Sequence, residues 1–364
     1  MRRLPPPGAP DRRGRLADSP LDIPGPGWKD VLRRLRIELA EDNLTLLAAG
    51  IAFYFMLSIF PGLIAFVSIW GLVADPAEVS RRMEQLFTLL PPEAAMVVAH
   101  QIDDLTNRSG SGLGLSALVS IAIALWSASK GAKALLAGLN VAYDEVEKRN
   151  MVRLQAMALL FTMGFVLFVT VSLTLIAGLP ALIERLPLGS AAKATSVALS
   201  WVLLFALVLG ALAAVYRYGP SRDEPHWRWV SVGSLAAAGL WLAASALFSF
   251  YASRFGSFNE TYGALAGAVL LLLWLQITAF VVLLGAELNA EAEHQTALDS
   301  TEGEPLPMGQ RNATMADTLG EASGTEASGV APTPPPVPDG ERTLAAHWRR
   351  TSAASGDAPP APRD

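Results

Sequence analysis

The sequence predicts an all-α, polytopic integral membrane protein with six transmembrane helices, both termini in the cytoplasm and an amphipathic helical hairpin after the first helix. Its 364 residues are 52% hydrophobic and only 17% charged, with a mean hydropathy of +0.36. A soluble domain usually carries about 25% charged residues. Long apolar segments recur along the chain, and Lys and Arg gather in alternate connections between them. Together these observations indicate a membrane-embedded helical bundle.

The two ends of the chain differ from the rest in composition. Residues 1–27 are rich in Pro, Gly, Arg and Asp, and residues 297–364 are rich in Pro, Gly, Ser, Thr and Ala. Such segments bury too little apolar surface to fold, so we expect both to be disordered. The C-terminal tail carries the acidity of the chain, because the 12 Asp and Glu from Ala290 onward outnumber the 5 Lys and Arg there.

A helical period begins between the first tail and the first apolar segment. In residues 28–43 the apolar side chains share one face, and Arg33, Arg34 and Arg36 lie elsewhere on the helix. A basic amphipathic helix beside a span suits the anionic cytoplasmic surface of a membrane. The alternative is an ordinary helix packed on the protein.

The first predicted span covers residues 44–73, which include no charged side chain over thirty positions. About 20 helical residues cross the core of a bilayer, so the segment is long enough. Pro61 lies near its middle and lacks a backbone donor, and we therefore expect a kink or break there. Transporters often place binding sites at such breaks; the alternative is a plain proline kink in a tilted helix.

A polar insertion at residues 75–108 follows, with helical apolar spacing on both sides of Pro91 and Pro92, and we expect a helical hairpin at the membrane surface. Five further spans complete a membrane domain of residues 44–296. Their approximate bounds are 113–129, 154–179, 195–216, 229–251 and 263–288. The segment before the first span holds nine Lys and Arg, and the second and fourth connections are also basic. This bias places both termini in the cytoplasm.

The sequence offers little for catalysis. The absence of cysteine excludes disulfides and thiolate metal sites, and the four histidines lack metal-ligand spacing. There is no phosphate-binding loop, no nucleophile elbow and no basic, aromatic patch that would grip nucleic acid. We therefore predict a protein that is not an enzyme, with no metal site, no cofactor and no nucleic-acid partner.

Polar residues at the edges of the spans are the candidates for function, because charge near a bilayer centre costs about 2.5–3.5 kcal/mol. Lys130 and Lys133 follow Trp126 and Ser127 at the cytoplasmic end of the second span, and Glu287 ends the sixth span on the same side. An ion pair between Glu287 and one lysine is one hypothesis. In the alternative, the lysines extend to the head groups and Glu287 is simply interfacial.

Three further polar side chains belong to the same candidate cavity. Gln276 lies near the middle of the sixth span, and Asn140 and Tyr143 lie on the connection after the second span. Small residues at a four-residue spacing predict where the helices meet closely. The predicted packing pairs are Ala48 with Ala52, Gly233 with Ala237, and Gly263 with Gly267.

Four blocks of the chain resemble the YihY/BrkB family of bacterial inner-membrane proteins, once labelled ribonuclease BN. The blocks are AAGIAFYFMLSIFP (48–61), LWSASKGAKALLAGLNVAY (125–143), NETYGALAG (259–267) and WLQITAFVVLLGAELNAE (274–291). The resemblance covers about residues 30–295. Asn259 lies in the third block, and the positions that match the family pattern are Tyr54, Ser58, Pro61, Trp126, Asn140, Tyr143, Tyr262, Gly263, Glu287 and Asn289.

The resemblance implies a role in the bacterial envelope, since family members have been linked to envelope integrity, serum resistance and lipid export. It favours a transporter or permease-like protein of the inner membrane that acts on a lipid or another amphiphile. In this interpretation the first and sixth spans flank a polar cavity, and the lysines attract an anionic head group. The alternative is a non-transporting scaffold for envelope assembly. The ribonuclease label does not suit a sequence without a metal cluster or a nucleic-acid surface.

Overall fold

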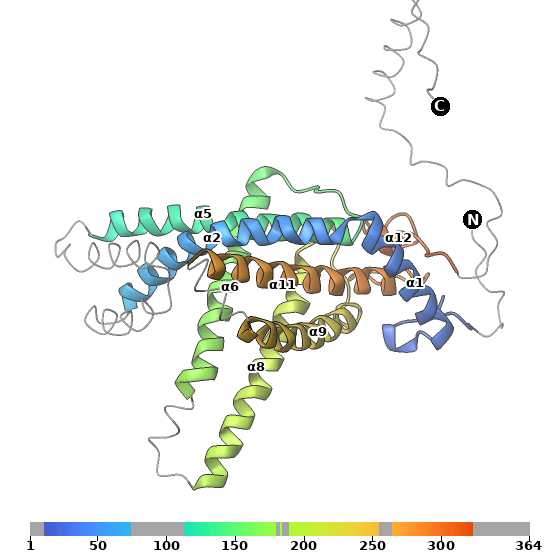
Figure 1. The fold of residues 1–364 in the computed structure, drawn as a ribbon. Coiled ribbons are helices and arrows are strands. Elements are labelled where there is room, and N and C mark those ends of the chain that lie inside the picture. Colours follow the sequence, from blue (N-terminus) through green and yellow to red (C-terminus); the bar gives the residue numbers. More distant parts are fainter. Residues whose placement is uncertain (1–10, 74–112, 180–182, 184–188, 255–263, 323–364) are drawn as a thin grey trace, which may run out of the picture. The chain divides into compact units, whose positions relative to one another are not determined.

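The computed structural model describes residues 11–73, 113–179, 183, 189–254 and 264–322. These residues are helical, apart from connecting segments and one isolated bridge between Pro225 and Thr301. They belong to a compact unit that spans Met1–Ser323; a second unit, Gly324–Asp364, lies outside the described residues. The all-α prediction is therefore confirmed for the described part of the chain (Figure 1).

Seven long helices make up the described bundle. They are α1 (Gly25–Glu41), α2 (Leu44–Val73), α5 (Leu113–Ala142), α6 (Met151–Leu173), α8 (Ser190–Tyr218), α9 (Trp227–Arg254) and α11 (Ala264–Glu293). Three short elements accompany them: the 3-10 turn η1 (Pro20–Asp22), the π-helical turn η2 (Thr174–Gly178) and α12 (Thr314–Asp317). The predicted third span, 154–179, thus corresponds to α6 together with η2.

Four of the described helices are long and apolar enough to cross a membrane. They are Met151–Ile176, Thr195–Tyr218, Trp227–Ala252 and Gly267–Glu293. The bent pair of α1 and the first part of α2 adds a fifth if it forms one span. Because α2 and α5 run partly through residues whose side chains are not described, six spans stay a prediction. The predicted hairpin at 75–108 lies outside the described residues.

The chain bends sharply between α1 and α2. The two helical segments meet at 61°, and Asn43 between them takes the left-handed backbone conformation, with φ 50°. Asn tolerates this conformation better than most residues, so it suits a corner. We expected a kink or break at Pro61; α2 continues through Pro61 to Val73 as one helix without a break, and a kink there stays a prediction. The corner therefore lies at Asp42–Asn43.

Helix α2 packs between α5 and α11. Leu44 and Ile51 of α2 form a buried cluster with Ala279 and Leu283 of α11. Gly138 of α5 faces the same cluster, where a Cβ atom would lie 2.7 Å from the Ile51 side chain. A small residue at this position lets the three helices approach closely, as helices do in lipid.

Helix α5 runs on to Ala142, past the predicted end of the second span at residue 129. The prediction treated this stretch as a connection because Lys130 and Lys133 begin it. The structure corrects this: Ala132, Leu136 and Leu139 are buried on one side of the continuing helix. An apolar stripe at helical spacing keeps α5 packed beyond its lysines.

Helices α9 and α11 meet at glycines. A Cβ atom on Gly233 would collide with the carbonyl of Gly285, and one on Gly285 would meet Ala237. Asn289 of α11 accepts a 2.7 Å hydrogen bond from the Gly233 N–H and donates to the Val230 carbonyl. Gly233 and Ala237 thus lie at a helix contact, whose α11 side is formed by Gly285.

Segments of both predicted tails have a defined path, which differs from the disorder we expected for 1–27 and 297–364. Arg311 is only 4% exposed and donates to four backbone carbonyls between Ala297 and Ala316. Arg15 donates to the Gly320 carbonyl at 2.8 Å and so links the two segments. Hydrogen bonds from Arg15 and the buried Arg311 hold residues 11–27 and 297–322 on the helix ends. Apolar burial adds to them, since Ile23 packs against Trp229 and Met315 joins the core cluster around Tyr143.

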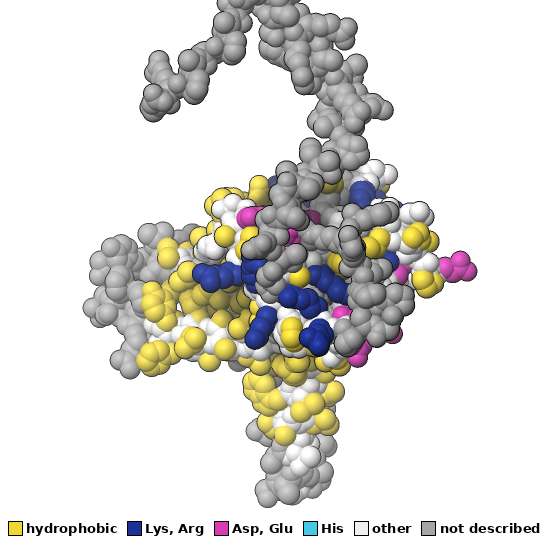
Figure 2. All heavy atoms as spheres, turned by 90° about the vertical axis from the view of Figure 1, so that its right-hand side faces the viewer, with side chains coloured by type: hydrophobic (Ala, Val, Ile, Leu, Met, Phe, Trp, Pro, Cys, Tyr) yellow, Lys and Arg dark blue, Asp and Glu magenta, His cyan; other side chains and the backbone are white. Residues whose placement is uncertain are grey.

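Hydrophobic side chains cover the outside of α6 and α8. Leu160, Phe165, Leu199 and Trp201 are each more than half exposed. Figure 2 shows this apolar surface at the bottom of the view, with Lys and Arg side chains gathered above it. An apolar surface of this extent is costly in water and suits contact with lipid.

Candidate functional site

Three carboxylates converge where α1 ends against α11. Glu38 lies on α1, Asp42 lies at the α1–α2 corner, and Glu287 lies on α11. One carboxylate oxygen from each residue lies within 4.8 Å of the others. Glu38 and Asp42 are partly buried, whereas Glu287 is only 1% exposed. We call Glu38, Asp42 and Glu287 the acidic triad.

No basic side chain neutralises the acidic triad within the described part of the chain. The Oε2 atom of Glu287 is buried without a hydrogen-bond partner. At an effective dielectric of about 20, two ionised carboxylates at this separation repel by roughly 3–4 kcal/mol. Burial, followed by the charges of Asp144 and Glu41, raises the pKa of Asp42 to about 6. The triad therefore favours an added proton or a bound cation.

A buried ion pair holds α1 in place beside the triad. Arg34 pairs with Glu291 through its Nε atom and donates to the Glu291 carbonyl from Nη2 at 3.0 Å. Its Nη1 atom donates to Gln295 Oε1 at 3.0 Å and to the Glu321 carbonyl at 2.9 Å. The nearest described arginine network thus serves Glu291, one helical turn from Glu287, and not the triad itself.

The lysines of α5 do not pair with Glu287 in the described structure, and that hypothesis is wrong here. The Lys133 Nζ atom lies 5.9 Å from the ring centroid of Trp126, and Lys130 is exposed. The reason is helical geometry. Gly131 faces α2, and its neighbours Lys130 and Lys133 lie about 100° and 200° round the helix from it. Trp126 is 57% exposed and Ser127 partly buried.

We call Trp126, Lys130 and Lys133 the basic face of α5. Neither lysine forms an ion pair with any described carboxylate. The cation–π contact with Trp126 stabilises one charge without cancelling it. The basic face therefore presents an aromatic ring and two positive charges that no described carboxylate pairs with.

On α2, Ser58 links that helix to α5. Its Oγ atom accepts a 3.0 Å hydrogen bond from the Gly131 N–H and donates to the Tyr54 carbonyl at 2.7 Å. Tyr54 is 45% exposed and makes an edge contact with Phe53. Pro61 is partly buried. Ser58 is thus a helix-to-helix contact, and Tyr54 faces outward.

Two of the predicted polar residues hold connections in place. Asn140 accepts from the Ser221 N–H at 2.7 Å and donates to Glu147 Oε2 at 3.0 Å. Tyr143 is fully buried, and the guanidinium of Arg222 lies 5.3 Å from its ring centroid. Asn140, like Asn289 at the α9–α11 contact, thus has hydrogen-bond partners within the protein. The Tyr143 hydroxyl is buried without one among the described residues.

The remaining predicted residues are scattered. Gln276 is partly buried on α11, and Ala48 and Ala52 are buried on α2. Gly267 is exposed, with no atom within 4 Å of where a Cβ would lie. Three predicted positions lie outside the described residues: Asn259, Tyr262 and Gly263.

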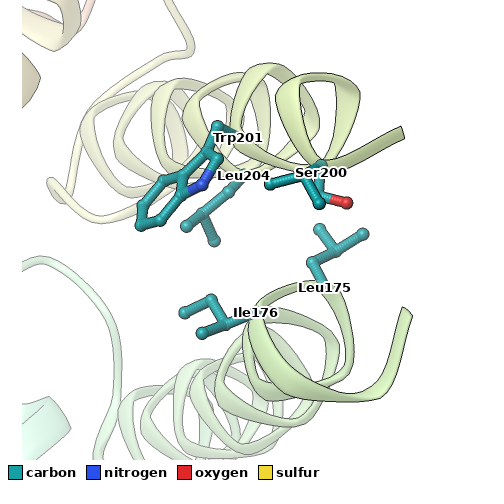
Figure 3. Close-up of a pocket in the computed structure, with 6 residues that line it drawn as sticks. Leu175, Ile176, Ser200, Trp201 and Leu204 are labelled. Atoms are coloured by element: carbon teal, nitrogen blue, oxygen red, sulfur yellow. The ribbon is translucent and has the colours of Figure 1, made fainter. Parts of the chain in front are cut away.

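An apolar pocket opens between η2 and α8 (Figure 3). Its lining residues are Leu175, Ile176, Val197, Ser200, Trp201 and Leu204. The Ser200 hydroxyl donates to the Ser196 carbonyl within its own helix. None of the predicted cavity residues lines this pocket, so it does not extend either the acidic triad or the basic face.

The fold defines the class of the protein, an α-helical membrane protein with several spans and charged clusters at its helix ends. The sequence then identifies the family. Residues 36–308 match the family described as Virulence factor BrkB, and the chain belongs to that family. This confirms the predicted resemblance to YihY/BrkB proteins.

Relatives of known sequence agree with this assignment. YfkH, a ribonuclease-like protein of Bacillus subtilis, is 32% identical over 251 residues, which cover 67% of this chain and 88% of that protein. A UPF0761 membrane protein of Alteromonas mediterranea is 27% identical over 268 residues, covering 70% and 87%. One from Tolumonas auensis is 37% identical over 89 residues, only 29% of its length. No solved structure matches the chain significantly.

Two groups of residues in the site were missed from the sequence. Glu38 and Asp42 belong to a helix that was interpreted only as basic and amphipathic. One signal was available: acidic residues in the last turn of a helix oppose its dipole. Gly285 was also missed, because the small-residue search looked for pairs within one helix.

Proposed function

We propose that the protein moves an anionic lipid or a similar amphiphile in the bacterial cytoplasmic membrane and is not an enzyme. The basic face of α5 supports this proposal. Lys130 and Lys133 lie beside the exposed ring of Trp126, and neither pairs with a carboxylate in the described part of the chain. Lys side chains at such a position attract anionic head groups, and Trp favours the membrane interface.

The proposed orientation has both termini in the cytoplasm, in line with the Lys and Arg bias of the connections. In the proposed mechanism, a head group leaves the bilayer surface and contacts Lys130 and Lys133 while its acyl chains stay in lipid. The surfaces of α6 and α8 favour this, since their exposed side chains are apolar. The chain offers no ATP-binding motif, so uphill movement would draw on an ion gradient or a separate partner.

Purified protein in liposomes tests the proposal. A fluorescent phosphatidylglycerol is placed in both leaflets, and a membrane-impermeant reductant reports how fast the inner pool reaches the outer leaflet. We expect faster movement than in empty liposomes, and at least a fivefold lower rate when Lys130 and Lys133 are both changed to Gln. Lys29→Gln removes an exposed lysine from α1 and is the matched control. Equal rates in the double variant and the control would refute a role for the basic face.

A scaffold for envelope assembly is the second candidate. The segments 11–27 and 297–322 favour it, since they form a hydrogen-bonded surface on the helix ends. The scaffold predicts that deletion of residues 298–364 abolishes the envelope phenotype, while the Lys130 and Lys133 variants retain it. The transport proposal predicts the reverse. The ribonuclease-like name of the Bacillus relative gives a third outcome, since metal-dependent RNA cleavage by the pure protein would contradict a non-enzymatic role.

A further inference from the structure

The acidic triad combines close approach with burial, and no described basic residue compensates it. Glu38 comes from α1, Asp42 from the α1–α2 corner and Glu287 from the distant α11, and one oxygen of each lies within 4.8 Å of the others. Neighbouring cations are already bound elsewhere: Arg34 serves Glu291, and Arg222 makes two contacts with Glu293 at 2.7 and 2.6 Å. Negative charge therefore accumulates at this corner.

Two independent features point to a ligand at the triad. The Oε2 atom of Glu287 is fully buried and has no partner among the described residues. In addition, α1 ends here with acidic residues and no basic residue in its last turn. The C-terminal end of a helix carries partial negative charge and favours a cation. Acids at this position are unfavourable alone and become favourable around a positive ion.

We propose that Glu38, Asp42 and Glu287 bind one divalent cation, with Ca²⁺ favoured over Mg²⁺. Carboxylate oxygens are the preferred ligands of both ions. Ca²⁺ binds six to eight oxygens at about 2.3–2.6 Å in flexible geometry, whereas Mg²⁺ binds at about 2.0–2.1 Å and usually keeps several of its waters. The three oxygens lie within 4.8 Å of one another, and Ca²⁺ accepts irregular oxygen ligands more readily than Mg²⁺, which demands near-ideal octahedral geometry.

The bound ion would fasten the α1–α2 corner to α11. Glu38 and Asp42 lie on one side of the junction and Glu287 on the other, so the ion bridges the two. This site goes beyond the proposed lipid movement and does not depend on it, because none of its ligands belongs to the basic face of α5.

Metal binding is measured on the whole protein in nanodiscs of phosphatidylcholine, a lipid without net charge, after chelator treatment. Ca²⁺ and Mg²⁺ are titrated calorimetrically, and melting is followed by tryptophan fluorescence with and without each ion. The variants are Glu287→Gln, Asp42→Asn and Glu38→Gln. Glu41→Gln is the matched control, because Glu41 is exposed in the same turn but is not part of the triad.

We expect one Ca²⁺ per chain, a rise in melting temperature with Ca²⁺, and at least tenfold weaker binding in each triad variant. The metal-free Glu287→Gln protein should melt no lower than the parent, because the change removes a carboxylate whose Oε2 atom is buried without a partner among the described residues. If Glu287→Gln does not fold, the partly buried Asp42→Asn decides the matter. The proposal is overturned by no response to Ca²⁺ in the parent, by unchanged binding in Asp42→Asn, or by an equal loss in Glu41→Gln.

Discussion

Replacing Arg34 by Gln tests how the α1–α2 corner is held against α11. Arg34 is 8% exposed and Glu291 1% exposed as side chains, so the pair is shielded from water. Removing one partner of a buried pair costs about 3–5 kcal/mol, largely because the other charge is left uncompensated. We expect Arg34→Gln to lower the free energy of unfolding by that amount. The variant leaves the Glu291 carboxylate without its arginine partner, one helical turn from Glu287 of the acidic triad.

The measurement is reversible unfolding in mixed micelles, with denaturing detergent titrated and tryptophan fluorescence recorded. The double variant Arg34→Gln, Glu291→Gln should cost about 1–3 kcal/mol less than the sum of the single variants, because the pair interacts directly. Arg36→Gln, an exposed arginine on the same helix, should change stability by less than about 0.5 kcal/mol. Additive costs, or a loss below about 1 kcal/mol for Arg34→Gln, would refute the reasoning.

Three further predictions concern stability and order. Because burial and neighbouring carboxylates raise the pKa of Asp42 from 3.8 to about 6, ionisation of Asp42 destabilises the fold progressively between pH 4 and pH 6. In chelator, Asp42→Asn should therefore raise the melting temperature at pH 7.5 but not at pH 4, and an equal effect at both would contradict this. Gly233→Val should lower the melting temperature, at a cost of about 1–3 kcal/mol or more, because its side chain meets the Gly285 carbonyl. Gly267→Val is the control, because its side chain has open space, and it should leave the melting temperature unchanged. An equal drop in melting temperature in both variants would argue against the α9–α11 contact. Arg311→Ala should make residues 297–322 sensitive to limited proteolysis, since it frees four carbonyls, and an unchanged digestion pattern would count against this anchor.

The helical elements were predictable because charge-free runs and Lys and Arg bias are properties of single segments. The extension of α5 to Ala142 was harder to predict. Lys130 and Lys133 mark the end of an apolar run in sequence, whereas Leu136 and Leu139 stay buried on the other side of the same helix. The order of residues 297–322 was missed for a related reason, because composition does not reveal a buried hub such as Arg311.

The acidic triad depends on tertiary structure that no local pattern contains. Glu287 was singled out from its position at the end of a span, but its neighbours were predicted to be lysines. Which side chains face it depends on the left-handed Asn43 corner and on the rotation of α5 set by Gly131 and Gly138. Neither of these can be read from apolar periodicity alone.

A structure in a nanodisc that includes phosphatidylglycerol tests the central claim most directly, namely that the basic face of α5 receives an anionic amphiphile. The account predicts a lipid phosphate within hydrogen-bonding distance of Lys130 or Lys133, with the ring of Trp126 at the head-group level. A basic face without lipid, or one covered by a second protein chain, would contradict it.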